Sequence, residues 1–217
     1  MNDIMKLNIN NDIAVSHLEF FPCVRQLVMF EKEKQIAIDV FENFPKQTLR
    51  NRTVVLSSQG LLNIIVPVKN KSKEKILTRD IEISYSERWN VEAWRTIFSC
   101  YGKSPFFIYY ADKIEQILYK QYTYLMDLNL EVFNFLKQAM HLQCELSVTL
   151  QYIERKENNY RDMFLPKNRE AEGRDLKPYY QCFSEKYGFQ TNLSALDLLF
   201  NLGNEAGEYL KNAVLNT

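Results

Sequence analysis

A run of basic and amide side chains, Lys46-Gln47-Thr48-Leu49-Arg50-Asn51-Arg52, holds the densest set of groups in this sequence that could do chemistry. It stands directly before a predicted strand. If the chain is extended here, Lys46, Thr48, Arg50 and Arg52 share one face. Guanidinium groups bind phosphates and carboxylates through paired hydrogen bonds, so this face could hold an anionic substrate. The alternative is an edge strand whose charges face solvent and discourage aggregation.

Aromatic residues form the second group of candidates. Trp94 lies on the apolar side of a predicted helix, and Arg95 flanks it. A dense aromatic cluster follows, made of Tyr101, Phe106, Phe107, Tyr109 and Tyr110. Sugar rings and bases stack on such surfaces, but aromatic side chains also build hydrophobic cores. The sequence leaves both interpretations open.

The sequence contains none of the common catalytic signatures: no G-x-S-x-G, no P-loop, no G-x-G-x-x-G and no H-E-x-x-H. The only histidines are His17 and His141, and His141 follows a predicted helix end, where it can complement the helix dipole. No catalytic residue, metal or cofactor is assigned on these grounds. The cysteines lack Cys-x-x-Cys spacing, which predicts reduced thiols and no structural zinc at Cys23, Cys100, Cys144 and Cys182.

Short strands and amphipathic helices must position these candidates. The apolar patterning predicts strands at Ile13–Val15, Gln35–Val40, Arg52–Leu56, Leu61–Val68 and 146–152. The residues Ser57-Ser58-Gln59-Gly60 predict a hairpin with a four-residue connection.

Capping signals predict where several helices begin. Ser84-x-x-Glu87 predicts the start of the helix that carries Trp94, and Asp127 or Asn129 predicts the start of a later one. Ser194-x-x-Asp197 predicts another helix, which Gly203 can end.

Composition indicates an ordinary globular chain of 217 residues, with 46% hydrophobic and 25% charged residues. Lys plus Arg and Asp plus Glu both number 27, so a neutral chain is not expected to bind nucleic acid or a membrane surface. The N-terminus has no signal-peptide pattern, and the apolar runs are too short to span a bilayer, which predicts a cytoplasmic location. We predict a single α/β (α+β) domain over 1–217, with a small mixed β-sheet flanked by several helices and a frayed segment 1–12.

Five segments, taken in order over about residues 14–210, resemble the WbqC-like protein family. They are HLEFFPCV, ENFPKQTLRNRTVV, LLNIIVPV, WNVEAWRTIFSCYGKSPFFIYY and KPYYQCFSEKYGFQTNLSALDLLFNLGNEA. The resemblance implies substrate-binding roles for Lys46, Gln47, Asn51, Arg52, Trp94, Arg95 and Asn192. The chain departs from the family pattern twice, with Ser16-His17-Leu18 where many members carry His-Gln-Pro, and Leu165-Pro166-Lys167 where others carry a histidine before Pro-Lys.

The family is similar to proteins encoded among O-antigen and surface-polysaccharide genes. The resemblance therefore implies an enzyme of surface-polysaccharide (O-antigen or capsule) biosynthesis, a transferase acting on a sugar or nucleotide-sugar. Lys46, Arg50 and Arg52 would hold a phosphate or carboxylate, and Tyr101 or Tyr109 would stack on a ring. The expected partner is a small anionic substrate. The alternative is a non-catalytic binding or scaffold protein of the same pathway.

Two further expectations concern geometry. Lys46, Asn51 and Arg52 should line one pocket together with Arg95. The charged segment 154–178 has little apolar periodicity and is predicted to be a long loop. We expect this loop to close over the basic pocket when ligand binds, adding the positive charges of Lys167, Arg169 and Arg174.

Overall fold

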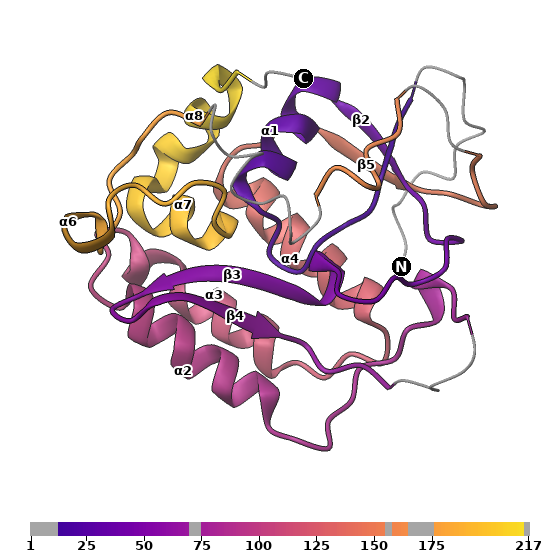
Figure 1. The fold of residues 1–217 in the computed structure, drawn as a ribbon, viewed down its shortest axis with the longest axis horizontal. Coiled ribbons are helices and arrows are strands. Elements are labelled where there is room, and N and C mark those ends of the chain that lie inside the picture. Colours follow the sequence, from indigo (N-terminus) through magenta and orange to yellow (C-terminus); the bar gives the residue numbers. More distant parts are fainter. Residues whose placement is uncertain (1–12, 70–74, 155–157, 165–175, 215–217) are drawn as a thin grey trace.

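The computed structural model describes residues 13–69, 75–154, 158–164 and 176–214. It contains a three-stranded parallel sheet and a separate two-stranded hairpin, with helices around both (Figure 1). The predicted α/β class is confirmed, and the strands divide between two small sheets. The segment 1–12, expected to be frayed, lies outside the described residues.

The parallel sheet consists of β1 (Ala14–Ser16), β2 (Gln35–Ile38) and β5 (Glu145–Val148), in the order β1-β2-β5. These confirm the predicted strands near 13–15, 35–40 and 146–152. The helix α1 (Val24–Glu33) connects β1 to β2, because parallel neighbours need a crossover that returns the chain to the same end of the sheet. The carboxyl ends of all three strands therefore meet at one edge.

The hairpin pairs β3 (Arg52–Ser57) with β4 (Gly60–Ile65) in antiparallel register. Ser57 pairs with Gly60, so the connection has two residues and not the four that were predicted. Gly60 has a φ of 107°, which glycine adopts without the steric penalty of a side chain. The Ser57 hydroxyl donates to the Gly60 carbonyl at 2.7 Å, and this bond closes the turn.

The basic run before β3 is not extended. Leu49–Asn51 form a 3-10 helix, η1, and the Thr48 hydroxyl accepts a hydrogen bond from the Arg50 backbone N–H at 3.2 Å. Because this cap starts a turn, successive side chains no longer alternate as they would in a strand. The expected common face of Lys46, Thr48, Arg50 and Arg52 is therefore not formed: Lys46 is exposed, whereas Arg50 is buried.

Helices surround both sheets. They are α2 (Trp89–Tyr101), α3 (Phe107–Tyr119), α4 (Leu125–Ala139), α6 (Ser184–Tyr187), α7 (Ala195–Leu202) and α8 (Ala206–Asn212), with 3-10 turns η2 (Thr78–Asp80) and η4 (Gly203–Glu205). The hairpin lies between α2 and α7, and α1 contacts both α7 and α8 (Figure 1).

Two of the predicted helix boundaries, the start and the end of α7, are confirmed. The Ser194 hydroxyl caps α7 by accepting a hydrogen bond from the Leu196 backbone N–H at 3.3 Å. Gly203 ends this helix with a φ of 55°, a left-handed conformation that glycine adopts readily.

Two other predicted helix starts are wrong. α2 begins at Trp89, beyond the predicted box at Ser84, whose hydroxyl instead lies 3.0 Å from the Ser86 hydroxyl. α4 begins at Leu125, so Asp127 and Asn129 both lie inside the helix. At α4 tertiary contacts explain the difference, because the Asn129 amide donates to distant backbone carbonyls and not to its own helix end.

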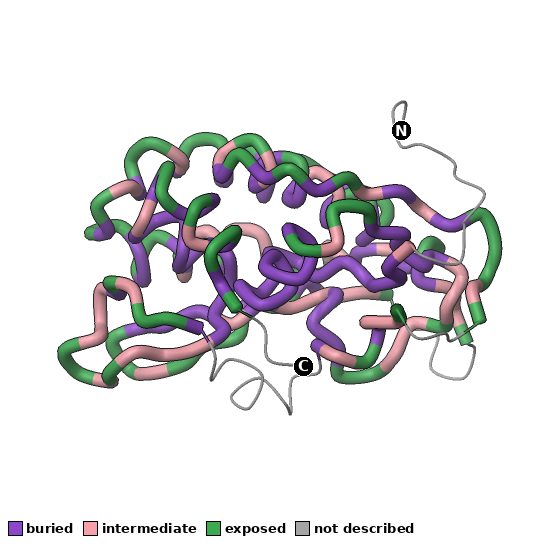
Figure 2. Tube along the Cα trace, turned by 90° about the horizontal axis from the view of Figure 1, so that it is seen from above, coloured by how far each residue is buried: buried purple, intermediate pink, exposed green. Residues whose placement is uncertain are grey.

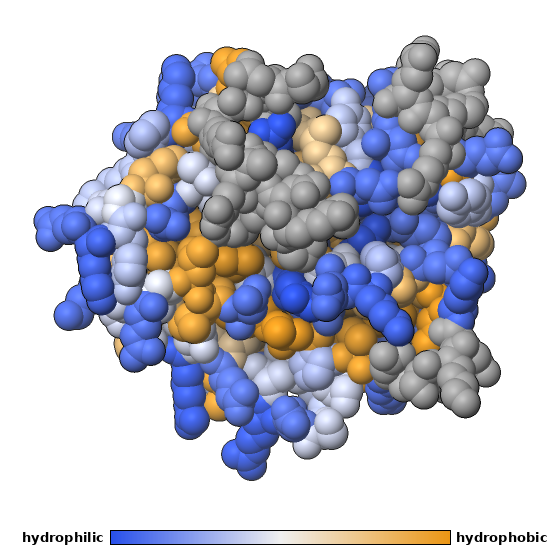
Figure 3. Space-filling model, in the orientation of Figure 1, coloured by the Kyte–Doolittle hydropathy of each residue, from blue (hydrophilic) through white to orange (hydrophobic). Residues whose placement is uncertain are grey.

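Apolar side chains from the helices and from both sheets form one buried cluster. Buried stretches run through the middle of the molecule, and exposed residues follow the outer loops and helix faces (Figure 2). On the face shown in Figure 3, apolar side chains gather over the region where Figure 1 draws the hairpin. The hairpin contributes partly exposed Leu61, Leu62 and Ile65. None of the helices in the described part of the chain is both long and apolar enough to cross a membrane.

The charged segment 154–178 is partly described. Arg161, Phe164 and Leu176 are buried, so this segment is anchored to the core at several points. Residues 155–157 and 165–175, including Lys167, Arg169 and Arg174, lie outside the described residues. Closure of this segment over a ligand stays a prediction.

Gly207 provides a test of how α8 packs on the end of α4. A Cβ atom on Gly207 would lie 1.9 Å from the Met140 carbonyl oxygen, so an alanine there forces the helix away. We expect Gly207→Ala to lower the free energy of unfolding by about 2 kcal/mol, as overpacked interiors usually do. Urea denaturation measures this change. Lys211→Ala, an exposed change on the same helix, should stay within about 0.5 kcal/mol of the wild type. A Gly207→Ala variant as stable as that control would contradict the close approach.

Candidate functional site

The carboxyl ends of β1, β2 and β5 bring polar residues to one edge of the parallel sheet. His17 follows β1, Asp39 follows β2 and Thr149 follows β5, and all three are buried. The Thr149 hydroxyl donates to Asp39 Oδ1 at 3.2 Å, and the Asp39 backbone N–H donates to the Ser16 carbonyl at 3.0 Å. Ligands of open α/β sheets bind at the carboxyl ends of the strands, so this edge is a candidate binding site.

Asp39 and Arg161 form a buried ion pair at this edge. The Arg161 guanidinium donates to Asp39 Oδ2 and also to the Ile153 carbonyl at 2.8 Å. The Asp39 carboxylate accepts further hydrogen bonds from the backbone N–H groups of Phe41, at 3.0 Å, and Ile153, at 3.3 Å. Asp39 is therefore fully engaged with protein groups, which indicates a structural role for it beside the site.

His17 and Glu19 form a second buried pair. His17 Nε2 lies 3.4 Å from Glu19 Oε1, and each side chain is only 1% exposed. Glu19 Oε2 accepts a hydrogen bond from the Cys23 backbone N–H at 2.8 Å, which holds the carboxyl group in place. Gln26 fixes the backbone of the pair, since its amide donates to the His17 carbonyl at 3.0 Å and accepts from the Glu19 N–H at 3.3 Å.

His17 is neutral at pH 7. Burial lowers the pKa of His17 well below its ordinary value, the positive charge of Arg50 lowers it further, and the Arg161 backbone opposes both only in part. Neither ring nitrogen makes a hydrogen bond of normal geometry within the described part of the chain. A neutral imidazole beside a carboxyl group is the arrangement that general bases use to accept a proton.

Arg50 brings positive charge to this region. Its guanidinium donates to the Thr48 hydroxyl at 2.8 Å and forms an ion pair with Glu42. Burial raises the pKa of Glu42, although the Arg50 charge beside it acts in the opposite direction. The Asn129 amide donates to the Leu18 carbonyl at 3.1 Å and to the Arg50 carbonyl at 2.8 Å, so α4 ties the histidine segment to the arginine segment.

Arg52 and Asn192, both predicted from the sequence, meet at a small cavity that Glu19 also lines. Its free volume is about 10 Å3, room for roughly one water molecule. The Asn192 side-chain oxygen accepts a hydrogen bond from the Arg25 backbone N–H at 3.0 Å. Asn192 has a φ of 52°, a left-handed conformation that asparagine tolerates better than most residues.

The other predicted residues near β3 do not line this cavity within the described part of the chain. Lys46 and Gln47 are exposed, and Gln47 adopts a φ of 52°. The Asn51 amide donates to the Val66 carbonyl at 2.9 Å, which joins η1 to the residue just after β4.

The predicted residues on α2 lie elsewhere. Trp94 is half-buried and stacks on Phe107, with 6.0 Å between ring centroids, and Arg95 is exposed. Tyr101 is buried against Phe200 at 5.2 Å. These aromatic residues contribute to the core, the second of the two interpretations that the sequence left open.

Sequence reasoning assigned no role to the His17–Glu19 pair. The signal was present: His17 lies two residues after the predicted strand Ile13–Val15 and opens the first segment of the family resemblance. What the sequence did not show is that Arg50 and Arg161 approach this histidine, since they lie 33 and 144 residues further along the chain.

A separate buried network surrounds Asp197. Asp197 Oδ2 accepts hydrogen bonds from the Tyr179 hydroxyl at 2.7 Å and from the Gln181 amide at 2.8 Å. Burial raises the pKa of Asp197 to about 6, and the hydrogen bonds that it accepts oppose this increase only in part. The predicted capping box is therefore half formed, because Ser194 caps α7 while the Asp197 carboxyl group turns inward.

The raised pKa predicts how stability responds to acid. Between pH 6 and about pH 4, the folded state binds a proton at Asp197 that the unfolded state does not, so this group stabilises the fold as the pH falls. Asp197→Asn should remove that gain, which is roughly 3 kcal/mol over the interval at about 1.4 kcal/mol per pH unit. Urea denaturation at pH 4, 5, 6 and 7 measures the difference between the wild type and the variant. A difference that does not change with pH would contradict the assignment.

The cysteines are free thiols, and three of the four are buried. Burial raises the pKa of the Cys100 thiol to about 11 and that of the Cys144 thiol to about 12, which leaves both protonated and weakly nucleophilic at pH 7. Among the described residues, no three His, Cys, Asp or Glu side chains gather in a way that could hold a metal ion.

Comparison with known proteins places this chain in a family. The model of the WbqC-like protein family matches residues 20–175, a range that contains Arg50, Arg52 and Arg161. The uncharacterized protein Rv1507c of Mycobacterium tuberculosis is 27% identical over 211 residues, which covers 85% of this chain and 90% of that relative. No solved structure matches the chain. Because the family model spans well over half of the sequence, the chain belongs to the WbqC-like protein family.

Proposed function

We propose that this protein is a transferase of surface-polysaccharide (O-antigen or capsule) biosynthesis that acts on a sugar or nucleotide-sugar. The observation that carries the proposal is the buried, neutral His17 at 3.4 Å from Glu19, beside Arg50 at the carboxyl edge of the parallel sheet. The chain belongs to the WbqC-like family, and the surface-polysaccharide pathway is what the resemblance to that family implies.

In the proposed chemistry, the His17 imidazole takes a proton and an arginine side chain stabilises negative charge. His17 takes the proton from a hydroxyl or amine of the acceptor as the acceptor atom bonds to the transferred group. The bond between that group and the donor phosphate breaks, and the electron pair leaves with the phosphate. An arginine stabilises the negative charge that develops there, most directly Arg52, whose side chain lines the cavity beside Glu19. Glu19 acts as a positioning residue, since its charge favours the imidazolium that forms.

The predicted substrate-binding residues take different places in this proposal. Arg52 and Asn192 line the cavity beside Glu19 and are proposed to contact the anionic group of the donor. Lys46, Gln47 and Asn51 lie just before β3 and would extend that contact toward solvent. Contact of Trp94, Arg95 and Tyr101 with substrate stays a prediction.

A thermal-shift screen against nucleotide-sugars, free nucleotides and acyl carriers tests the binding part. A ligand that binds only the folded protein raises the melting temperature in proportion to its saturation. Hits are then incubated with saccharide acceptors, and release of the nucleotide or carrier is followed by mass spectrometry. We expect a charged donor to raise the melting temperature in the wild type and to do so less in Arg52→Ala, with Arg88→Ala, an exposed arginine at the start of α2, as the control.

A non-catalytic binding or scaffold protein of the same pathway is the second candidate. The small volume of the cavity beside Arg52 favours it, because about 10 Å3 leaves no room for a sugar ring between the described side chains. The same screen separates the two: binding without turnover of any donor and acceptor pair supports the scaffold, and turnover supports the transferase.

A further inference from the structure

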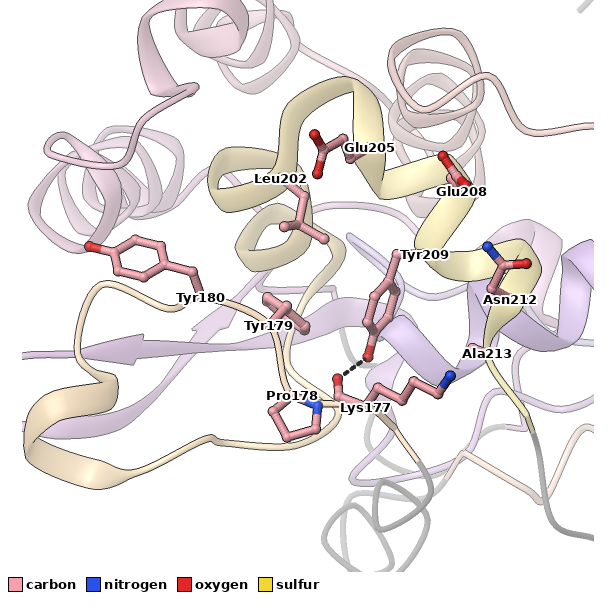
Figure 4. Close-up of a pocket in the computed structure, with 10 residues that line it drawn as sticks. All are labelled: Lys177, Pro178, Tyr179, Tyr180, Leu202, Glu205, Glu208, Tyr209, Asn212 and Ala213. Carbon is pink, nitrogen blue, oxygen red and sulfur yellow. Dashed lines mark hydrogen bonds between the residues drawn. The ribbon is translucent and has the colours of Figure 1, made fainter.

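A larger cavity lies away from the His17–Glu19 pair, between the segment that follows Lys177 and the helices α7 and α8 (Figure 4). Its volume is about 570 Å3, within the range of about 300–1,000 Å3 in which proteins hold small molecules. Three tyrosines contribute to its wall: Tyr179, Tyr180 and Tyr209. Neither the family nor the relative assigns a role to this place.

Two of these tyrosine rings are fixed before any ligand arrives. The Tyr179 ring packs edge-to-face on Phe189 and on Tyr209, each at 5.2 Å between centroids. The Tyr179 hydroxyl donates to Asp197 at 2.7 Å, and the Tyr209 hydroxyl donates to the Lys177 carbonyl at 2.6 Å (Figure 4). Since both hydroxyl protons are already used by the protein, these residues offer a ligand mainly their rings. A rigid ring surface lowers the entropy cost of binding.

Polar side chains, including both negatively and positively charged ones, surround the rings. Glu205 and Glu208 supply carboxylate acceptors, and Lys177 and Asn212 supply donors. The charged residues that line the cavity sum to one net negative charge, from two glutamates and one lysine. This set suits the many hydroxyl groups of an uncharged sugar and repels a phosphate, which is the opposite of what Arg50 and Arg52 provide.

A second cavity, of about 680 Å3, shares one lining residue with the first. That residue is Tyr180, which is 59% exposed and stands where the two cavities adjoin. The second cavity adds two more aromatic side chains, Phe98 and Phe183, together with the small polar residues Ser58 and Ser99. Aromatic rings spaced along adjoining cavities match a ligand built of several rings in a row.

We propose that these adjoining cavities bind an uncharged oligosaccharide, with Tyr180 between two sugar-binding subsites. The binding itself rests on the cavities alone. The site is separate from the basic residues Arg50 and Arg52 and goes beyond the proposed function, and its lining is aromatic and weakly acidic.

Saturation-transfer NMR tests this proposal with three uncharged probes: maltotetraose, cellotetraose and chitotetraose. We expect saturation transfer from the wild type to at least one of them, and a two- to tenfold weaker affinity, roughly the worth of one ring contact, in Tyr180→Ala. Tyr180→Phe, which keeps the ring, should bind as the wild type does. The matched control is Tyr119→Ala, which removes another exposed tyrosine, at the end of α3, that lines neither cavity.

The outcomes separate this proposal from the proposed function. Saturation transfer to no probe, or equal affinity in Tyr180→Ala and the wild type, overturns the saccharide site. Displacement of the bound tetrasaccharide by uridine diphosphate also overturns it, because the cavity would then accept an anion. Saccharide binding by a wild-type protein that turns over no donor and acceptor pair supports the saccharide site while the transferase proposal fails.

Discussion

Arg161→Ala is expected to lower the free energy of unfolding by about 3–5 kcal/mol, because it leaves the Asp39 carboxylate buried without its positive partner. Both side chains are at most 1% exposed, so water cannot replace the lost contact. The variant also loses the hydrogen bonds from the guanidinium to the Ile153 carbonyl and to the Asn159 side chain. Since this ion pair joins the end of β2 to the segment beyond β5, its loss should loosen the edge of the sheet that carries His17.

Urea denaturation at pH 7 measures this loss in the free energy of unfolding. Two further variants serve as comparisons. Lys69→Ala breaks an exposed ion pair with Glu82 and should cost about 1 kcal/mol or less. The double variant Asp39→Asn with Arg161→Met removes both charges and should recover part of the loss, because no buried charge is then left alone. Arg161→Ala within 1 kcal/mol of the wild type would show that the pair does not support the fold.

His17→Asn is expected to lower the turnover of the transfer reaction by about 10²–10⁴-fold, the usual contribution of a general base. Asparagine has a similar size and keeps a polar group at the site but cannot accept the proton from the acceptor. Donor binding should be retained, because the proposal assigns the donor phosphate to Arg52 and Asn192. Steady-state kinetics and the donor-induced thermal shift measure the two properties separately.

The pH profile distinguishes a base from a merely structural histidine. The wild-type rate should hold at neutral pH and fall only in acid, because burial and the Arg50 charge keep the pKa of His17 well below its ordinary value. In Glu19→Gln the acid limb should move to lower pH, because the carboxylate charge no longer favours the imidazolium. His141→Asn, a change at the exposed histidine of the chain, is the matched control and should leave rate and profile unchanged. A His17→Asn variant with the activity of that control would rule out His17 as the base.

Local physics made much of the secondary structure predictable from the sequence. The strands β1 to β5 were found because β-branched and apolar residues alternate or cluster over short runs bounded by turn residues. Ser194 and Gly203 were identified as the ends of α7 because a hydroxyl cap and a left-handed glycine act on their immediate neighbours. The α2 and α4 starts were wrong because Ser84 and Asn129 bond to groups outside the helix ends that their spacing predicted.

The candidate site was predictable only in part, for the same reason. The sequence and its family resemblance identified Arg52 and Asn192, which lie 140 residues apart and line one cavity. They did not identify the His17–Glu19 pair, whose neutral imidazole depends on burial and on an arginine from a different segment. A side chain's pKa and its freedom to accept a proton depend on which groups surround it. The sequence alone therefore determined the elements and several of the polar residues, whereas the tertiary structure decided which of them are buried together, because long-range packing sets burial and charge proximity.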